Sequence, residues 1–310
     1  MMRGKNSTST KRIHAKRTSR FVLNLKHLFA YPYGLWLTIF IALPLLLVGY
    51  YSITATDAAG NTYFTLRHFR MFFEASFPGQ PFFSRLYVNV ALRSLRLALL
   101  TTVITFVLGY PVAYIMAGKG FSDKSVLLFL FIAPMWMNFL VRTYAWLAIL
   151  SRNGILNTFL AWLGLPILDI LFTDAAVLLG MVYNFLPFMV LPIYTALRKM
   201  DPRIIEAAQD LGANSTTVFR RVVFPLSMPG VISGITMVFM PAAATFIIPN
   251  LLGGGQYFLL GNLVEQQFLR VGNWNFGSAI AVIMIGLMLI SVLVLSRVDT
   301  EKTKEGGALV

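Results

Sequence analysis

Two carboxylates stand four residues apart in a short polar stretch, Glu206 and Asp210, preceded and followed by long apolar runs. Like charges at this spacing share one helix face and repel each other mildly unless a cation from elsewhere answers them. The apolar side of the same stretch is short and suits a partner's groove better than lipid. The pattern favours a docking element, and the alternative is a plain amphipathic hairpin at a membrane surface.

The residues around these carboxylates predict how they are held. Asp201 precedes a proline and can cap a helix whose first residue needs no amide donor. Gly212 follows the last apolar position, where a left-handed helix stop requires a residue without Cβ. Asn214 or Ser215 can start a second helix, which Pro225 is expected to end. The prediction is helix, tight glycine turn, helix.

A second group of residues could contact a small solute within the apolar runs. Trp136 and Asn138 form one polar-aromatic cluster, with Arg142 a turn further on, and Tyr183 and Asn184 form another. Polar groups in lipid tend to face the interior of a helix bundle. Tryptophan and tyrosine faces attract ammonium groups by roughly 0.5 to 2 kcal/mol each. The alternative is that these residues only pack between helices, and Arg142 would itself repel a cation.

Acidic residues that could attract a cationic solute lie between the apolar runs. Asp174 stands at the mouth of the run that contains Tyr183, and Glu265 has several glutamines nearby. Such carboxylates could form an entry funnel for a cation. Each of them could equally be an exposed loop charge.

Composition restricts the class of protein. The 310 residues are 57% hydrophobic and only 12% charged, whereas a soluble domain carries about twice that charged fraction. The chain has no cysteine, and its three histidines have no ligand spacing, so we expect no disulfide, metal or other cofactor. The net charge of +14 does not predict nucleic-acid binding, because the basic residues gather on one side of the apolar runs.

Six apolar runs approach the ~20 residues that a bilayer requires. They predict spans at 33–53, 92–117, 125–150, 174–197, 228–252 and 275–296. Residues 1–30 are expected to form a basic, disordered tail that could touch lipid, residues 31–297 the membrane domain, and 298–310 a second tail. Most of the 26 lysines and arginines then lie on one side, which places both termini and the 201–225 loop in the cytoplasm.

The 201–225 loop resembles the "EAA" loop of bacterial ABC importer permeases. The matching residues are Glu206, Ala207, Ala208, Gly212, Val222, Phe224 and Pro225. The resemblance implies cytoplasmic coupling helices that sit in a cleft of a separate ATPase. It implies that Glu206, Ala207, Ala208, Gly212 and Pro225 serve this coupling.

Further segments are similar to the spermidine/putrescine permease family. They include 108–111, 134–138, 186–189, 206–230 and 273–277. This resemblance implies an all-α membrane protein, a six-transmembrane-helix, MetI-like permease of the bacterial inner membrane. It implies a second related permease, two ATPase subunits and an extracytoplasmic solute-binding protein as partners, and no enzymatic activity, since the chain has no phosphate-binding loop.

The sequence is compatible with three hypotheses about transport, two of which differ only in the solute. A polyamine is expected from the resemblance, and the same machinery could carry an opine, an amino-acid derivative or an oxyanion. A third alternative is an ion-coupled secondary transporter, which would need a deep acid that the predicted spans lack.

Overall fold

The computed structural model describes residues 31–57, 60–74, 86–118 and 124–307. The predicted basic tail, 1–30, lies outside these described residues. In the C-terminal segment predicted as a tail, the described residues continue the last helix to Gly307.

Five continuous helices in the described ranges are long and apolar enough to cross a membrane. They are Tyr31–Ser52, Leu86–Ala117, Asp174–Lys199, Ser215–Ala244 and Trp274–Val294. The first ends with η1 (Thr38–Ala42) and α2 (Leu43–Ser52), the next two are α4 (Leu86–Ala117) and α8 (Asp174–Lys199), and the last belongs to α14 (Trp274–Gly307). Each of five predicted spans thus overlaps one of these helices.

The predicted span at 125–150 is wrong as a single helix. The structure has α5 (Lys124–Ile132), a 3₁₀ turn η2 (Ala133–Trp136) and α6 (Phe139–Leu150) instead. Met137 is extended, and the Asn138 side chain accepts a hydrogen bond from the Leu140 amide at 2.8 Å, so it caps a new helix. Apolar content predicts only that residues 125–150 are long enough to cross a bilayer. The turn at Pro134 and the capping residue Asn138 divide this apolar run into two helices.

The predicted span at 228–252 begins earlier and ends earlier than expected. One helix runs through α10 (Ser215–Val218), the π-helical turn η3 (Phe219–Val223) and α11 (Phe224–Ala244). Thr245 is extended, and α12 (Ile247–Leu252) follows as a separate short helix. Pro225 therefore does not end a helix. It occupies the first turn of α11, where the wider π-helical turn before it accommodates a residue without an amide donor.

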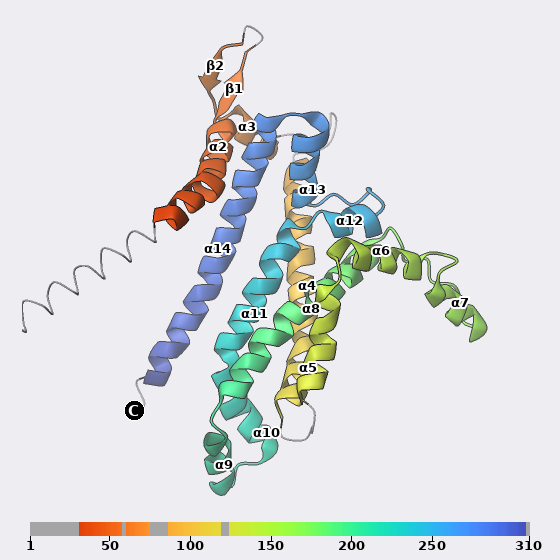
Figure 1. The fold of residues 1–310 in the computed structure, drawn as a ribbon, viewed down its shortest axis with the longest axis vertical. Helices are drawn as coiled ribbons and strands as arrows, with labels where there is room; N and C mark the ends of the chain where they lie inside the picture. The colour runs from red at the N-terminus through yellow and green to blue at the C-terminus, as the bar shows by residue number, and fades with distance from the viewer. Residues whose placement is uncertain (1–30, 58–59, 75–85, 119–123, 308–310) are drawn as a thin grey trace, which may run out of the picture.

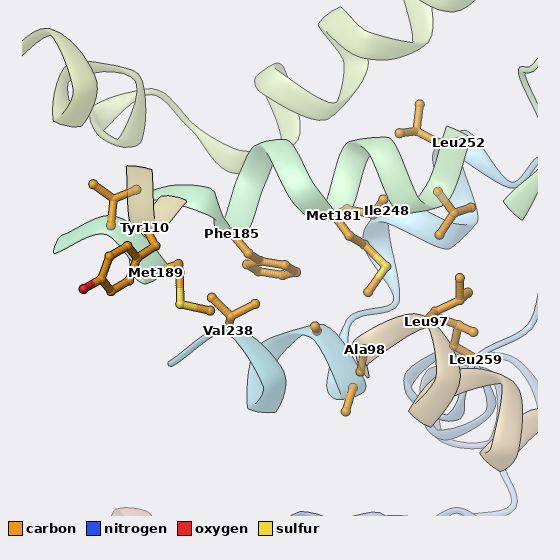
Figure 2. Close-up of a cluster of buried hydrophobic side chains, with 14 of the residues drawn as sticks. Leu97, Ala98, Tyr110, Met181, Phe185, Met189, Val238, Ile248, Leu252 and Leu259 are labelled. Carbon is orange, nitrogen blue, oxygen red and sulfur yellow. The ribbon is translucent and has the colours of Figure 1, made fainter. Parts of the chain in front are cut away.

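Helices α4, α8 and α11 form the centre of the bundle (Figure 1). Small residues permit their close approach: a Cβ added at Gly109 would lie 3.1 Å from Val190, and one added at Gly234 would lie 2.8 Å from the Met189 sulfur. Figure 2 shows the buried side chains between them, with Met189 near Tyr110 and Val238. The glycine spacing in α11 serves close helix contact, as small residues do in membrane bundles.

The remaining elements lie at the two ends of the bundle, except α7 (Ile155–Trp162), which projects to one side (Figure 1). They are β1 (Thr54–Thr56), β2 (Thr62–Phe64), α3 (Arg67–Glu74), α7 (Ile155–Trp162), α9 (Pro202–Asp210), α13 (Leu260–Glu265) and η4 (Gln266–Val271). The antiparallel β1–β2 hairpin is a small addition to the predicted all-helical fold. It lies at the end of the bundle opposite α9 and α10 (Figure 1).

Candidate functional site

The predicted helical hairpin is formed by α9 and α10 at one end of the molecule (Figure 1). The Asp201 side chain accepts a hydrogen bond from the Arg203 amide at 3.0 Å, and Pro202 is the first residue of α9. At the other end of α9, Gly212 has φ +82, and its amide donates to the Gln209 carbonyl at 2.9 Å. Together with the Ala213 amide, which bonds to Ala208 at 3.1 Å, this is a Schellman motif.

The second helix of the hairpin begins where a cap was expected. Asn214 accepts a hydrogen bond from the Thr217 amide at 2.8 Å, which makes Asn214, rather than Ser215, the cap. The helix then passes through the π-helical turn into α11 without a break. The hairpin therefore continues directly into one membrane helix, while Met200 and Asp201 make an extended connection to the other.

Most side chains of α9 are exposed. Glu206 and Ala207 are exposed, Ala208 is half-buried, and Leu211 at the tip is 89% exposed. An apolar side chain so exposed on a polar helix is the geometry of a docking element. The inner side of α9 faces a hollow of about 580 Å³ lined by Ile205, Glu206 and the end of α4.

The first solute-path cluster lies at the break between α5 and α6. Trp136 is 75% exposed, and its ring meets that of Phe129 at 5.5 Å in an edge-to-face arrangement. Asn138 is occupied as the cap of α6. Arg142 is buried, with its guanidinium 5.9 Å from the Phe139 ring, and its Nε has no hydrogen-bond partner among the described residues.

The second cluster lies on α8 and divides into two environments. Tyr183 is 38% exposed, and its ring pairs with Trp146 at 5.3 Å. Asn184 is buried, donates to the Gly180 carbonyl at 2.9 Å, and leaves its Oδ1 without a partner among the described residues. Trp136 and Tyr183 thus belong to separate aromatic pairs, although Trp146, the partner of Tyr183, lies one turn beyond Arg142 on α6.

Both predicted carboxylates of the entry funnel have arginine partners. Asp174 accepts a hydrogen bond from Arg93 at 2.6 Å, and Arg93 also stacks over the Tyr257 ring at 4.3 Å. Glu265 lies 3.4 Å from Arg270. A cation approaching either acid would compete with a guanidinium already in place. The sequence carries no signal for the first pair, because its members are 81 positions apart.

A hollow that the sequence did not indicate lies along α8 and α11. Its volume is about 910 Å³, and Phe188, Thr195, Gly230, Ser233 and Met237 are among its lining residues. The hydroxyls of Thr195 and Ser233 bond to carbonyls in their own helices, so the lining is mainly apolar. The alternation of small and large residues at helical spacing in α11 is the signal that could have indicated it.

Known transport proteins are similar in sequence to this chain over different shares of its length. It is 40% identical over 277 residues to the spermidine/putrescine transport system permease protein PotB of Escherichia coli (strain K12), which covers 87% of this chain and 97% of that protein. It is also 33% identical over 122 residues to the spermidine/putrescine transport system permease protein PotC of Shigella flexneri, which covers 39% of this chain and 46% of that protein.

The fold is similar to that of a solved transporter chain. The alginate ABC transporter in complex with an alginate pentasaccharide-bound periplasmic protein matches with a TM-score of 0.75 and 17% identity, over 93% of this chain and 98% of that one. This similarity confirms the prediction of a helical ABC permease fold. A family model described as "binding-protein-dependent transport system inner membrane component" matches residues 109–301. The chain therefore belongs to the family of inner membrane components of binding-protein-dependent transport systems.

Proposed function

We propose that this chain forms part of the translocation path of an ATP-driven importer for polyamines such as spermidine and putrescine. The observation that carries the proposal is the 40% identity to PotB over nearly the whole of both chains. An ion-coupled secondary transporter is set aside, because the family depends on a solute-binding protein.

The proposed assembly contains four kinds of partner. A second, related permease completes the path. The weaker similarity of this chain to PotC supports a PotC-like chain as that second permease. Two cytoplasmic ATPase subunits receive the α9–α10 hairpin, and a soluble binding protein delivers the solute to the opposite end. Lipid covers the exposed aliphatic side chains of α2, such as Leu45 and Leu46.

In the proposed cycle the ATPases close on ATP and carry the hairpin with them. Glu206, Ala207 and Ala208 supply the docking surface, and the left-handed Gly212 keeps α9 and α10 at a fixed angle. Movement of α11 and α8 then alternates access to the path near Trp136 and Tyr183. The exposed ring faces of these two residues suit an ammonium group.

Uptake measurements test the coupling and the solute together. Labelled spermidine and putrescine would be supplied to cells that lack their own polyamine importers and express this chain with its partner subunits. We expect saturable uptake that falls to background with Glu206→Lys. Asp169→Lys, an equal charge change at an exposed residue far from α9, should leave uptake intact. No uptake from a complex that is intact in the membrane would refute the polyamine proposal.

Orientation can be tested separately because the chain has no cysteine. Single cysteines would replace Leu211 at the hairpin tip, 89% exposed, and Trp162 in α7, 79% exposed. A membrane-impermeant thiol reagent added to intact cells should label Trp162→Cys alone. Labelling of Leu211→Cys from outside would reverse the proposed orientation, which otherwise rests on the one-sided distribution of lysine and arginine.

Buried Arg142 favours one alternative, an anionic solute carried by the same machinery. Its Nε lacks a hydrogen-bond partner in the described part of the chain, and a guanidinium binds carboxylate or oxyanion groups well. Competition assays distinguish the two: unlabelled polyamines should block uptake if the main proposal holds, and anionic amino-acid derivatives should block it if the alternative holds.

A further inference from the structure

A π-helical turn lies where the coupling hairpin becomes a membrane helix. Residues Phe219–Val223 form this turn, between α10 and α11, and the helix is continuous on both sides. Single π-helical turns within α-helices are rare and occur frequently at functional sites. A one-residue change of register in such a turn would rotate α10 relative to α11. The turn therefore needs something to fix its register if the hairpin is to transmit force.

Tyr110 of α4 lies against this turn from the neighbouring helix. Its ring centroid is 5.8 Å from that of Phe219, the first residue of the turn, and 5.5 Å from that of Phe224, the residue after it. Tyr114, one turn further along α4, meets Phe219 at 5.4 Å. Phe219 thus packs against two tyrosines of α4, and Tyr110 alone spans both ends of the turn.

The Tyr110 hydroxyl adds a directed bond to these ring contacts. It lies 2.9 Å from the Ser227 Oγ, and the Ser227 hydroxyl lies 2.9 Å from the Phe224 carbonyl. Because Ser227 uses its single proton on that carbonyl, Tyr110 is the donor in the first bond. The chain of two bonds connects α4 to the first turn of α11. Both side chains are buried, so water does not compete.

The position of Tyr110 is itself fixed from behind. Gly109 lies directly against α8, where an added Cβ would be 3.2 Å from the Met189 Cγ. Gly230 of α11 also lies against α8, where an added Cβ would be 2.6 Å from the Ala196 Cβ. Helices α4, α8 and α11 therefore meet closely around the turn, and a displacement of one is opposed by the other two.

From this geometry we infer that Tyr110 is the positioning residue of the coupling segment. It holds the π-helical turn in register through Ser227 and Phe219, so that the α9–α10 hairpin, α11 and α4 move as one body. The inference rests on the proposed coupling role of the hairpin. It assigns a function to a residue that touches neither the ATPase docking surface nor the candidate solute clusters.

The test uses the intact complex of this chain with its partner subunits. Tyr110→Phe removes only the hydroxyl and keeps the ring, Ser227→Ala removes its acceptor, and the double variant removes both. Hydrogen–deuterium exchange of the amides between 215 and 228 should be about two- to tenfold faster in each single variant. The double variant should exchange no faster than Ser227→Ala, since both lack the Tyr110–Ser227 bond and the Ser227–Phe224 bond. Solute imported per ATP hydrolysed in proteoliposomes should fall several-fold.

Tyr114→Phe is the matched control. Tyr114 contacts the same Phe219 from the same helix, but it is 45% exposed, and no hydrogen bond joins its hydroxyl to a described residue. Its exchange and its transport ratio should match the wild type. Exchange in Tyr110→Phe equal to that in Tyr114→Phe overturns the inference, and faster exchange with an unchanged transport ratio overturns the coupling role. If the wild type imports no polyamine, the proposed solute fails while the exchange comparison still tests Tyr110.

Discussion

The α9–α10 hairpin and the opposite end of the molecule are held by hydrogen bonds of different range. At the coupling end, Asp201, Gly212 and Asn214 bond to backbone groups no more than a few residues away. At the opposite end, the Asn262 side chain joins Leu259, Phe246 and Asn250. The coupling end can therefore move as a preformed unit, whereas the opposite end is a cross-linked cap.

Longer-range bonds strengthen the second half of this contrast. The Leu260 amide donates to Ser94 of α4 at 2.7 Å, across 166 positions of sequence. Asn275 at the start of α14 donates to the Thr54 carbonyl at 2.6 Å, across 221 positions. Buried polar bonds of this kind fix the ends of several spans relative to each other. In the proposed alternating-access cycle, the cross-linked end stays fixed while the α9–α10 hairpin moves with the ATPases.

The largest expected effect comes from backbone strain in the turn between α9 and α10. Gly212→Val places a β-branched residue at φ +82, a conformation that costs such a side chain about 1–3 kcal/mol. We expect uptake to fall close to background while the chain remains in the membrane, because α9 and α10 lose their fixed angle.

Gly60 provides a matched control for this strain. It has φ +83 in the turn of the β1–β2 hairpin, with open space around it. Gly60→Val imposes similar strain outside the coupling end. If both variants transport equally well, the proposed difference between the α9–α10 hairpin and the opposite end of the molecule is wrong. Uptake and membrane content of both variants, compared with the wild type, decide this.

The next effect compares two buried asparagines, Asn262 at the end opposite the hairpin and Asn184 within α8, which differ in the number of their hydrogen bonds. Asn262→Leu removes three hydrogen bonds and leaves the buried Leu259 amide without its partner, which should cost about 2–4 kcal/mol of stability. Asn184→Leu removes one bond and also a buried oxygen without a partner. It should be nearly neutral.

Thermal denaturation of the solubilised complex measures both variants. Each asparagine is only 1% exposed, so the comparison holds burial and the substitution constant. A clear loss of stability in Asn184→Leu, equal to that in Asn262→Leu, would show that Asn184 has a partner outside this chain or a role in the path.

A smaller effect is expected at Trp136. Trp136→Ala should leave stability almost unchanged, because the side chain is 75% exposed in the single chain. It should reduce uptake if the ring contacts the solute. Phe159→Ala, at an exposed aromatic of α7 that is 54% exposed, is the control for loss of an aromatic surface. Equal uptake by the two variants would remove Trp136 from the path.

The smallest effect should come from Asp174. Its ion pair with Arg93 is partly exposed, with side-chain exposures of 33% for Arg93 and 50% for Asp174, and such pairs contribute about 0–1 kcal/mol. Asp174→Asn should hardly change stability. A double-variant cycle with Arg93→Gln measures the pair itself, and a fall in uptake without a fall in stability would assign Asp174 to the entry of the solute.

Sequence patterns predicted most of the fold and the local geometry of the α9–α10 hairpin. Apolar length gave five membrane helices, and residues 201, 212 and 214 gave the caps and the turn of the coupling hairpin. The sequence predicts a helix end at Pro225, but the helix continues because the π-helical turn before it accommodates the missing amide donor. It also predicts one span at 125–150, but apolar content does not indicate where a capping side chain interrupts a helix.

The solute-path residues depended on contacts that no local pattern records. Trp136 and Tyr183 pair with different rings, Asp174 pairs with an arginine of another helix, and Asn184 is buried. Caps, glycine stops and apolar length act within a few residues of chain, so the sequence alone determined the helices and the coupling hairpin. Ion pairs, aromatic pairs and the Tyr110–Ser227 bond join residues brought together only when helices pack, so the tertiary structure decided them.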